Sequence, residues 1–243
     1  MTEKHFQGGF MFYGIGVGVG NSDTVTKRAI DVLGKLDVLY VPTAKKTEKD
    51  STAHKIAKDY INEKTLIKSR YFPMNYDSAK LQSAWNEIAS EIIQDVSEGK
   101  NAGFITIGDP MVYSTYIYLL KLLRDKVKVE TIPGIASFLD IAANNNFPLV
   151  EGDDPLVILP ATIGTERLRS YIKNENSIVL MKVYNNFDEI AEMLLEENLQ
   201  NHSIIVSNSS KDEEVIYRNI KDISKSDVSY FTTILINKRW EIL

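Results

Sequence analysis

Short apolar runs alternate with longer amphipathic stretches over the first part of the chain. The apolar runs predict strands at Phe12–Val17, Val38–Val41, Leu66–Tyr71, Phe104–Ile107 and Val127–Ile132. The stretches between them predict helices. One is expected at Thr24–Leu36, with Asn21, Ser22 or Asp23 able to cap it. Another, Ser78–Glu98, carries the clearest apolar stripe at helical spacing. Because strands and helices alternate, this part of the chain predicts a mostly parallel sheet with helices on both faces.

The pattern changes at N-N-N-F-P-L-V-E-G-D-D-P, residues 144–155, a polar stretch with two prolines. We place a domain boundary there, with residues 1–145 in an N-terminal α/β domain and residues 146–243 in a C-terminal α/β domain. Further strands are expected at Leu156–Leu159, Ile178–Val183, Ile204–Val206, Val215–Tyr217 and Phe231–Ile236, and helices at Glu166–Lys173 and Asp188–Glu197. No clear helix separates the last two strands, which predicts a mixed sheet with an antiparallel part.

Composition and charge exclude several classes of function. The chain has 243 residues and a formal net charge of −5, which gives no global case for binding nucleic acid. It has no cysteine, which excludes disulfides, zinc–thiolate sites and cysteine nucleophiles, and its three histidines, His5, His54 and His202, lack the spacing of metal ligands. No apolar run approaches the roughly 20 residues that span a bilayer, and the N-terminus lacks the apolar region of a signal peptide. We therefore expect a cytoplasmic protein without a membrane partner.

A sharp turn follows the fourth predicted strand. Gly108, Asp109 and Pro110 break the chain before a helix that is predicted to begin at Val112. Ligands of open parallel sheets bind in crevices at the carboxyl ends of strands, where the Asp109 carboxylate could accept hydrogen bonds from a ligand hydroxyl or amine. The alternative is that Asp109 only caps the following helix.

Similar turns follow two other predicted strands. After the first strand, G-I-G-V-G-V-G-N (residues 14–21) fails the dinucleotide fingerprint G-x-G-x-x-G, because Val19 and Asn21 stand where glycine is required. Its alternating glycines allow close approach of a ligand or of another backbone, and a plain tight turn is the alternative. After the fifth strand, P-G-I-A-S (residues 133–137) again places small residues between strand and helix. We expect the three turns to cluster at one edge of the sheet.

Together these turns resemble the signature of a known enzyme family. G-I-G-V-G-V-G-N, I-G-D-P-M-V-Y-S and T-I-P-G-I-A-S-F are similar to the motif set of the tetrapyrrole (corrin/porphyrin) methyltransferases, which use S-adenosylmethionine. Within the family, F-P-L-V-E-G-D-D-P-L-V-I-L-P and V-L-M-K-V-Y are most similar to the enzymes that methylate C20 of precorrin-2 or cobalt-precorrin-2 in cobalamin biosynthesis. The resemblance covers nearly the whole chain and implies two αβα domains with the active site in the cleft between them.

The resemblance also implies which residues contact the methyl donor. They are Val19, Ile107, Gly108, Asp109, Val112, Ala136, Ser137, Met181 and Ser209. The first loop departs from the usual family pattern G-x-G-P-G-D, because Val19 replaces the proline and Asn21 replaces the acid. The loop therefore lacks the proline and the carboxylate that the family usually has there, while Val19 keeps an apolar wall.

The tetrapyrrole substrate that the resemblance implies carries carboxylates around its rim. Lys45, Lys46 and Lys49 follow the second predicted strand and are expected to meet some of these carboxylates, with a merely solvated loop as the alternative. Tyr113 is a further candidate for substrate binding. A general base would help to remove the C20 proton, and Tyr113, Tyr184 and Asp109 are candidates by position alone.

Other functions stay open at this stage. They are another methylase of the same superfamily, such as a diphthine synthase-like enzyme or another precorrin methylase, and a non-catalytic protein that binds a tetrapyrrole or S-adenosylmethionine. The sequence leaves open whether the ring already carries cobalt. Members of the family are usually homodimers, and we expect a homodimer by resemblance.

Overall fold

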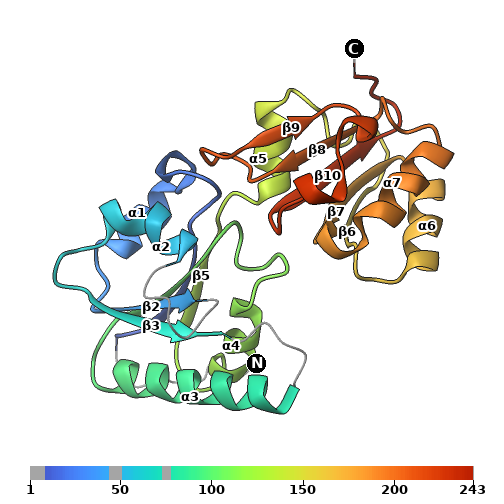
Figure 1. Cartoon of the computed structure of the whole chain (residues 1–243). Coiled ribbons are helices and arrows are strands. Elements are labelled where there is room, and N and C mark those ends of the chain that lie inside the picture. Colours follow the sequence, from blue (N-terminus) through green and yellow to red (C-terminus); the bar gives the residue numbers. More distant parts are fainter. Residues whose placement is uncertain (1–8, 44–50, 73–77, 243) are drawn as a thin grey trace. The chain divides into compact units, whose positions relative to one another are not determined.

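The computed structural model describes residues 9–43, 51–72 and 78–242, which form two compact α/β units (Figure 1). The first unit is Met1–Ala136 and the second is Ser137–Leu243. This division falls earlier than the boundary between residues 145 and 146 that the sequence suggests. The reason is that helix α5 (Ser137–Asn144) packs against strand β10 (Thr232–Asn237) and so belongs to the second unit.

The sheet of the first unit is parallel throughout, as the sequence predicts. Its strands are β1 (Phe12–Gly16), β2 (Val38–Thr43), β3 (Leu66–Tyr71), β4 (Ala102–Thr106) and β5 (Val129–Ile132). They lie in the order β3-β2-β4-β1-β5. Strands β4, β1 and β5 are therefore neighbours, and the three motif-bearing turns that follow them leave the sheet side by side.

Helices cover both faces of this sheet (Figure 1). On β4, Phe104 and Ile105 point to opposite faces, and both side chains are fully buried. The helices on the face of Phe104 are α3 (Ser78–Ser97) and α4 (Tyr116–Leu123), and those on the face of Ile105 are α1 (Lys27–Leu33) and α2 (Thr52–Ala57). Burial on both faces explains why the strands read as continuous apolar runs.

Two helices begin later than the sequence suggests. Helix α1 starts at Lys27, where the Thr26 hydroxyl caps it by accepting a 3.2 Å hydrogen bond from the Ala29 amide. Asn21 caps a separate short 3-10 helix, η1 (Ser22–Thr24), instead. Helix α4 starts at Tyr116 and not at Val112, because Tyr113 has φ +49 and so cannot continue a right-handed helix.

The second unit has a mixed sheet, in agreement with the sequence. Its strands are β6 (Leu156–Pro160), β7 (Ser177–Met181), β8 (Ser203–Ser207), β9 (Val215–Tyr217) and β10. The order is β6-β7-β10-β8-β9, and only β6 and β7 pair in parallel. The last strand in sequence therefore lies at the centre of the sheet and pairs with β7 on one side and β8 on the other.

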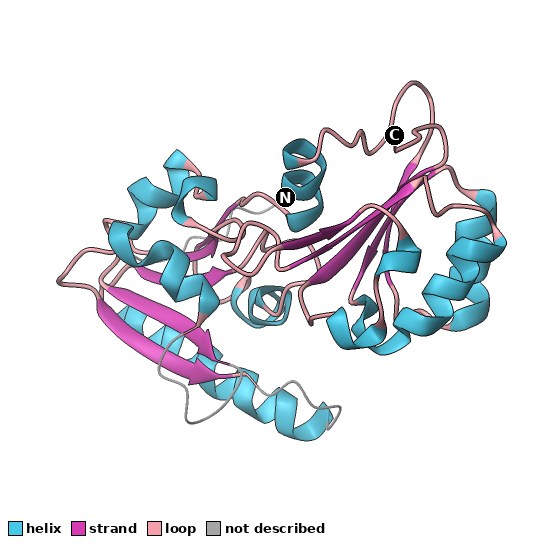
Figure 2. Cartoon of the chain, turned by 45° about the horizontal axis from the view of Figure 1, so that its top comes forward, coloured by secondary structure: helices cyan, strands magenta, loops and turns pink. Residues whose placement is uncertain are grey.

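Helices α6 (Thr165–Asn174) and α7 (Phe187–Glu196) cover one face of the second sheet, and α5 lies on the other (Figures 1 and 2). The face of α6 and α7 holds the main core of this unit, which includes the fully buried Ile172, Phe187 and Ile190. Within the described ranges, none of the helices is long and apolar enough to cross a membrane.

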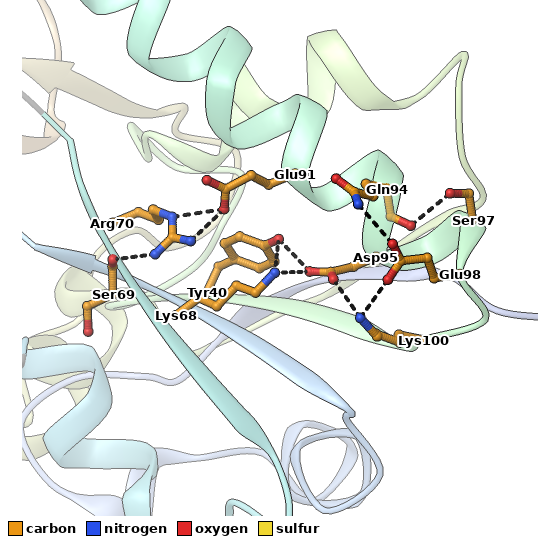
Figure 3. Close-up of polar contacts among 10 residues, drawn as sticks. All are labelled: Tyr40, Lys68, Ser69, Arg70, Glu91, Gln94, Asp95, Ser97, Glu98 and Lys100. Atoms are coloured by element: carbon orange, nitrogen blue, oxygen red, sulfur yellow. Dashed lines mark hydrogen bonds and ion pairs between the residues drawn. The ribbon is translucent and has the colours of Figure 1, made fainter.

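A polar network joins α3 to strands β2 and β3 (Figure 3). The buried Asp95 carboxylate accepts hydrogen bonds from the Tyr40 hydroxyl (2.6 Å), the Lys68 ammonium (2.6 Å) and the Lys100 ammonium (3.1 Å). Burial acts to raise the pKa of Asp95, but the hydrogen bonds from Lys68, Tyr40 and Lys100 outweigh it and leave the pKa lowered. Burial and the hydrogen bond to Asp95 raise the pKa of Tyr40. Asp95 is therefore a charged anchor of α3 on the sheet.

Candidate functional site

The turns after β1, β4 and β5 meet at one edge of the first sheet, which confirms the clustering expected from the sequence. The Gly108 amide donates a 2.7 Å hydrogen bond to the Gly18 carbonyl, and the two residues form an isolated antiparallel bridge. The Gly134 amide donates a 3.2 Å hydrogen bond to Oδ2 of Asp109. These bonds join all three turns into one rim, made of residues 16–21, 107–112 and 134–136.

Two glycines of the rim are required by close approach of backbone. A Cβ on Gly16 would lie 2.6 Å from both the Gly108 oxygen and the Gly134 nitrogen. A Cβ on Gly134 would lie 2.2 Å from the Gly108 oxygen. Since real Cβ atoms do not approach backbone this closely, only glycine permits the three turns to touch.

Glycine is required at position 108 because of the backbone conformation there. Its φ is +69, and the nearest neighbours that a Cβ would meet are Ala136 Cα and the Ile135 oxygen, both at 3.9 Å. The position therefore needs the left-handed backbone, while a Cβ there would make only ordinary van der Waals contacts. Ala136 is buried beside Gly108. Small residues in a turn of this kind permit close approach of a ligand to the backbone.

Backbone amides hold both carboxylate oxygens of Asp109 by hydrogen bonds. Oδ1 accepts a 2.8 Å hydrogen bond from the Met111 amide, and Oδ2 accepts the bond from Gly134. Each carboxylate oxygen keeps a lone pair that a ligand hydroxyl or amine could use. Asp109 therefore shapes the rim, and it does not cap α4, which begins well after it.

The first loop is stiffened by Thr24 in place of the missing proline. The Thr24 hydroxyl accepts a 2.9 Å hydrogen bond from the Val19 amide and donates a 2.8 Å bond to the Val19 carbonyl. The Asn21 side chain accepts a 3.0 Å bond from the Asp23 amide. Val19 itself is buried, so it lines the loop as an apolar wall.

Gly14 corrects one part of the sequence interpretation. A Cβ on Gly14 would overlap the Tyr116 ring at 2.1 Å. The Tyr116 ring is fully buried, and its hydroxyl forms a 2.6 Å hydrogen bond with the Thr131 hydroxyl. Gly14 therefore makes room for a core tyrosine and has no part in the rim.

Tyr113 lies on the turn after β4 in a strained conformation. Its φ of +49 is rare for a bulky residue, and its side chain is 42% exposed. Partial burial raises the pKa of Tyr113, so its phenol is protonated at neutral pH. A neutral phenol can donate a hydrogen bond to a ligand, whereas it is a poor general base.

The remaining residues of the first unit implied by the resemblance lie on the same rim. Ile107 packs against the core on the α1 face, and the half-buried Val112 donates a 3.3 Å hydrogen bond from its amide to the Asp109 carbonyl. Lys45, Lys46 and Lys49, the proposed contacts to substrate carboxylates, lie outside the described residues.

In the second unit, Met181 and Ser209 come to one edge of the second sheet. Met181 ends β7, and Ser209 follows β8; both strands flank β10 and end at the same side. The half-buried Ser137 begins α5. The Ser209 hydroxyl donates a 2.8 Å hydrogen bond to Asp140, so its side chain is already engaged within the unit.

Sequence reasoning missed two residues that hold these loops. The sequence predicts Thr24 only as the start of a helix, and nothing in its spacing marks it as a partner of Val19. Asp140 is buried and accepts hydrogen bonds from the hydroxyls of Ser209 (2.8 Å) and Ser210 (2.7 Å). Its signal was an acid inside the otherwise apolar run S-F-L-D-I-A-A.

Known proteins match this chain over most of its length. The family model of the tetrapyrrole (corrin/porphyrin) methylases matches residues 11–223. A cobalt-precorrin-2 C(20)-methyltransferase of Salmonella typhimurium is 36% identical, over 94% of this chain and 97% of its own length. A probable cobalt-precorrin-2 C(20)-methyltransferase of Methanocaldococcus jannaschii is 35% identical, over 94% of this chain and 96% of its own.

The fold has solved relatives as well. The structure of uroporphyrin-III C-methyltransferase from Thermus thermophilus, complexed with S-adenosylhomocysteine, superposes with a TM-score of 0.63 at 16% identity, over 94% of this chain and 97% of that one. Fold, glycine-bearing rim and family match agree with one another. The chain therefore belongs to the tetrapyrrole (corrin/porphyrin) methylase family.

Proposed function

We propose that this protein transfers the methyl group of S-adenosylmethionine to C20 of cobalt-precorrin-2 in cobalamin biosynthesis. The observation that carries the proposal is the 36% identity to the Salmonella enzyme over nearly the full length of both chains. The relative from Methanocaldococcus jannaschii, whose name also specifies the cobalt-bearing substrate, supports the cobalt form over metal-free precorrin-2.

The rim of the first unit suits a donor with amine, hydroxyl and ring portions. We propose that the donor contacts Val19, Ile107, Gly108, Asp109, Val112, Ala136, Ser137, Met181 and Ser209. The small residues Gly108 and Ala136 and the free lone pairs of Asp109 support this set. Tyr113 is proposed to donate a hydrogen bond to the substrate, and Lys45 and Lys46 to bind its carboxylates.

The activated donor leaves little covalent chemistry for the protein to perform. The sulfonium supplies an activated methyl group: the bond from C20 to the methyl carbon forms as the bond from sulfur to that carbon breaks. The sulfur is left as a neutral thioether, and C20 then loses its proton to a base or to water. The residues above must align the two reactants, which can contribute about 7–11 kcal/mol to lowering the barrier.

None of the three candidate bases is favoured by the geometry. Both carboxylate oxygens of Asp109 already accept backbone hydrogen bonds, from Met111 and Gly134. Tyr113 has a raised pKa and stays protonated. The exposed Tyr184 has no feature that marks it as a base.

The proposal is tested by incubating the purified protein with methyl-labelled S-adenosylmethionine and either cobalt-precorrin-2 or precorrin-2. Label is expected in the tetrapyrrole at C20, with the cobalt form preferred, when the product is examined by NMR with a 13C-methyl donor. Label in a protein substrate instead would indicate a diphthine synthase-like activity. Binding of both ligands without transfer would indicate a non-catalytic protein.

We also propose that the protein is a cytoplasmic homodimer, on the ground of its family resemblance. Light scattering coupled to size exclusion should give twice the mass of 27.5 kDa for one chain. Elution at the mass of a single chain over the micromolar range would remove the dimer from the proposal. Cell fractionation tests the location separately.

A further inference from the structure

The loop that follows β8 presents a lysine on an exposed aromatic pair. Lys211 Nζ lies 3.6 Å from the centroid of the Phe231 ring, and Phe231 meets Tyr230 edge-to-face at 5.2 Å between centroids. Both aromatic side chains are exposed, Tyr230 by 56% and Phe231 by 40%. We name Lys211, Tyr230 and Phe231 the lysine–aromatic platform.

The platform is held firmly in place. The Asn208 amide donates a 3.0 Å hydrogen bond to the Phe231 carbonyl, and the Lys211 amide donates one of the same length to the Asn208 carbonyl. Asn208 and Ser210 both have left-handed backbone, with φ +56 and +57. Backbone in this region costs free energy and persists where the surrounding structure enforces it, which is common at ligand sites.

The buried Asp140 fixes the other side of the loop. Its carboxylate accepts hydrogen bonds from the hydroxyls of Ser209 and Ser210, at 2.8 and 2.7 Å. The Ser210 amide donates a further 2.6 Å bond to Glu214. Asp140 and Glu214 are thus engaged with hydroxyl and amide groups of this loop and form no ion pair with Lys211.

Lys211 is a cation without a counterion in the part of the chain that the structure describes. No carboxylate there forms an ion pair with it, although Glu213 contributes a favourable field. Partial burial lowers the pKa of Lys211, because it removes part of the water around the ammonium. An anion that reached Nζ would compensate this lost solvation with a charge-assisted hydrogen bond.

We propose that the lysine–aromatic platform binds the tetrapyrrole, with Lys211 pairing to one carboxylate on the rim of the macrocycle and the exposed rings of Tyr230 and Phe231 packing against its flat apolar surface. This inference rests on the proposed function for the identity of the ligand. Lys211 is two residues from Ser209 at the edge of the second sheet where β7 and β8 end. A flat ring with acidic side chains matches the two chemistries that the platform displays, an aromatic surface and a cation.

The methyl donor also carries a carboxylate, so the experiment must separate the two ligands. Lys211→Gln and Lys211→Arg are compared with Lys221→Gln, which removes an exposed lysine from η4 (Ile220–Asp222), beyond β9 and away from the platform. Binding of cobalt-precorrin-2 is followed by anaerobic absorbance titration, and binding of S-adenosylhomocysteine by calorimetry. Thermal unfolding of each variant establishes that it is folded.

Lys211→Gln is expected to weaken tetrapyrrole binding about tenfold or more, with unchanged affinity for S-adenosylhomocysteine and a weaker dependence on salt. Lys211→Arg should retain most of the affinity, and Lys221→Gln should match the wild type. Unchanged tetrapyrrole binding in a folded Lys211→Gln protein would overturn the inference, as would a loss confined to S-adenosylhomocysteine. Wild-type methyl transfer reports separately on the proposed function, so failure of one is distinguishable from failure of the other.

Discussion

The amide of Gly108 and the carbonyl of Gly18 are 2.7 Å apart, and this single hydrogen bond joins the turns that leave β1 and β4. Both residues have left-handed backbone, with φ +71 at Gly18 and +69 at Gly108. The rim therefore depends on two adjacent strands ending in conformations that side chains disfavour. Its geometry is sensitive to small additions of volume, which leads to the first prediction.

Gly16→Ala is expected to destabilise the protein by about 1–3 kcal/mol and to weaken binding of S-adenosylhomocysteine. The added methyl would lie 2.6 Å from backbone atoms of Gly108 and Gly134, which must move apart. Gly34→Ala is the matched control, because its Cβ would make only ordinary contacts at 3.6 and 4.0 Å. Chemical denaturation and calorimetry measure the two effects. A Gly16→Ala protein as stable as Gly34→Ala would contradict the tight approach of the turns.

Thr24→Val should loosen the first loop without changing the volume of the side chain. It removes both hydrogen bonds to Val19 and is expected to cost about 1 kcal/mol per bond at most. Because the loop belongs to the proposed donor site, the affinity for S-adenosylhomocysteine should fall more than the stability. Thr24→Ser keeps the hydroxyl and should behave as the wild type. Equal affinities in the valine and serine variants would show that the loop does not need Thr24.

Asp95 should contribute a pH-dependent part of the stability. Its pKa is lower in the folded protein than in the unfolded chain, so its contribution is complete above about pH 4 and is lost as the pH falls through the lowered folded-state pKa. Asp95→Asn removes that contribution and leaves Lys68 without its buried partner, at a cost of up to about 3–5 kcal/mol.

The measurement is the free energy of unfolding from pH 7 down to pH 2. The difference in free energy of unfolding between the wild type and Asp95→Asn should become smaller as the pH falls below 4. Asp59→Asn changes an exposed aspartate in the same unit and serves as the control for the loss of one negative charge. If this difference stayed constant over the range, the pKa of Asp95 would be the same in the folded and unfolded states.

Tyr113 is expected to be strained in the folded protein. Comparing Tyr113→Gly with Tyr113→Ala isolates the backbone, since both variants lose the ring and only glycine tolerates φ +49 freely. The glycine variant should be about 1 kcal/mol more stable than the alanine variant, while both lose affinity for the tetrapyrrole. Denaturant titrations that rank alanine above glycine would mean that the turn relaxes around the substitution.

Much of the fold follows from periodicity alone. The apolar runs of the first unit mark strands buried on both faces. The second sheet is mixed as expected, but its antiparallel pairs join β10 to β7 and β8 and join β8 to β9, and β9 does not pair with β10. Element ends were less predictable. The start of α4 is displaced because Tyr113 adopts a left-handed backbone, which no residue preference for tyrosine would suggest.

The rim was predictable as a cluster, but the reason for each glycine was not. Gly14 and Gly16 stand in one motif, yet Gly14 accommodates the ring of Tyr116, and Gly16 accommodates the backbone of Gly108 and Gly134. These partners come from the turns after β4 and β5 and from α4, far away in sequence, so spacing within the motif could not distinguish them. The same holds for Lys211, whose aromatic neighbour Phe231 lies on a different loop.

The central place of β10 in the second sheet has a consequence for synthesis on the ribosome. β7 and β8 emerge from the exit tunnel before Thr232–Asn237 has been translated, so each strand has an unpaired edge until β10 is available. The first unit, by contrast, has all its strands once Ile132 has emerged. The nascent chain should therefore acquire protease resistance in two steps, first in the first unit and then in the second. Until β10 has been synthesised, the unpaired strands of the second unit can pair with the wrong partners.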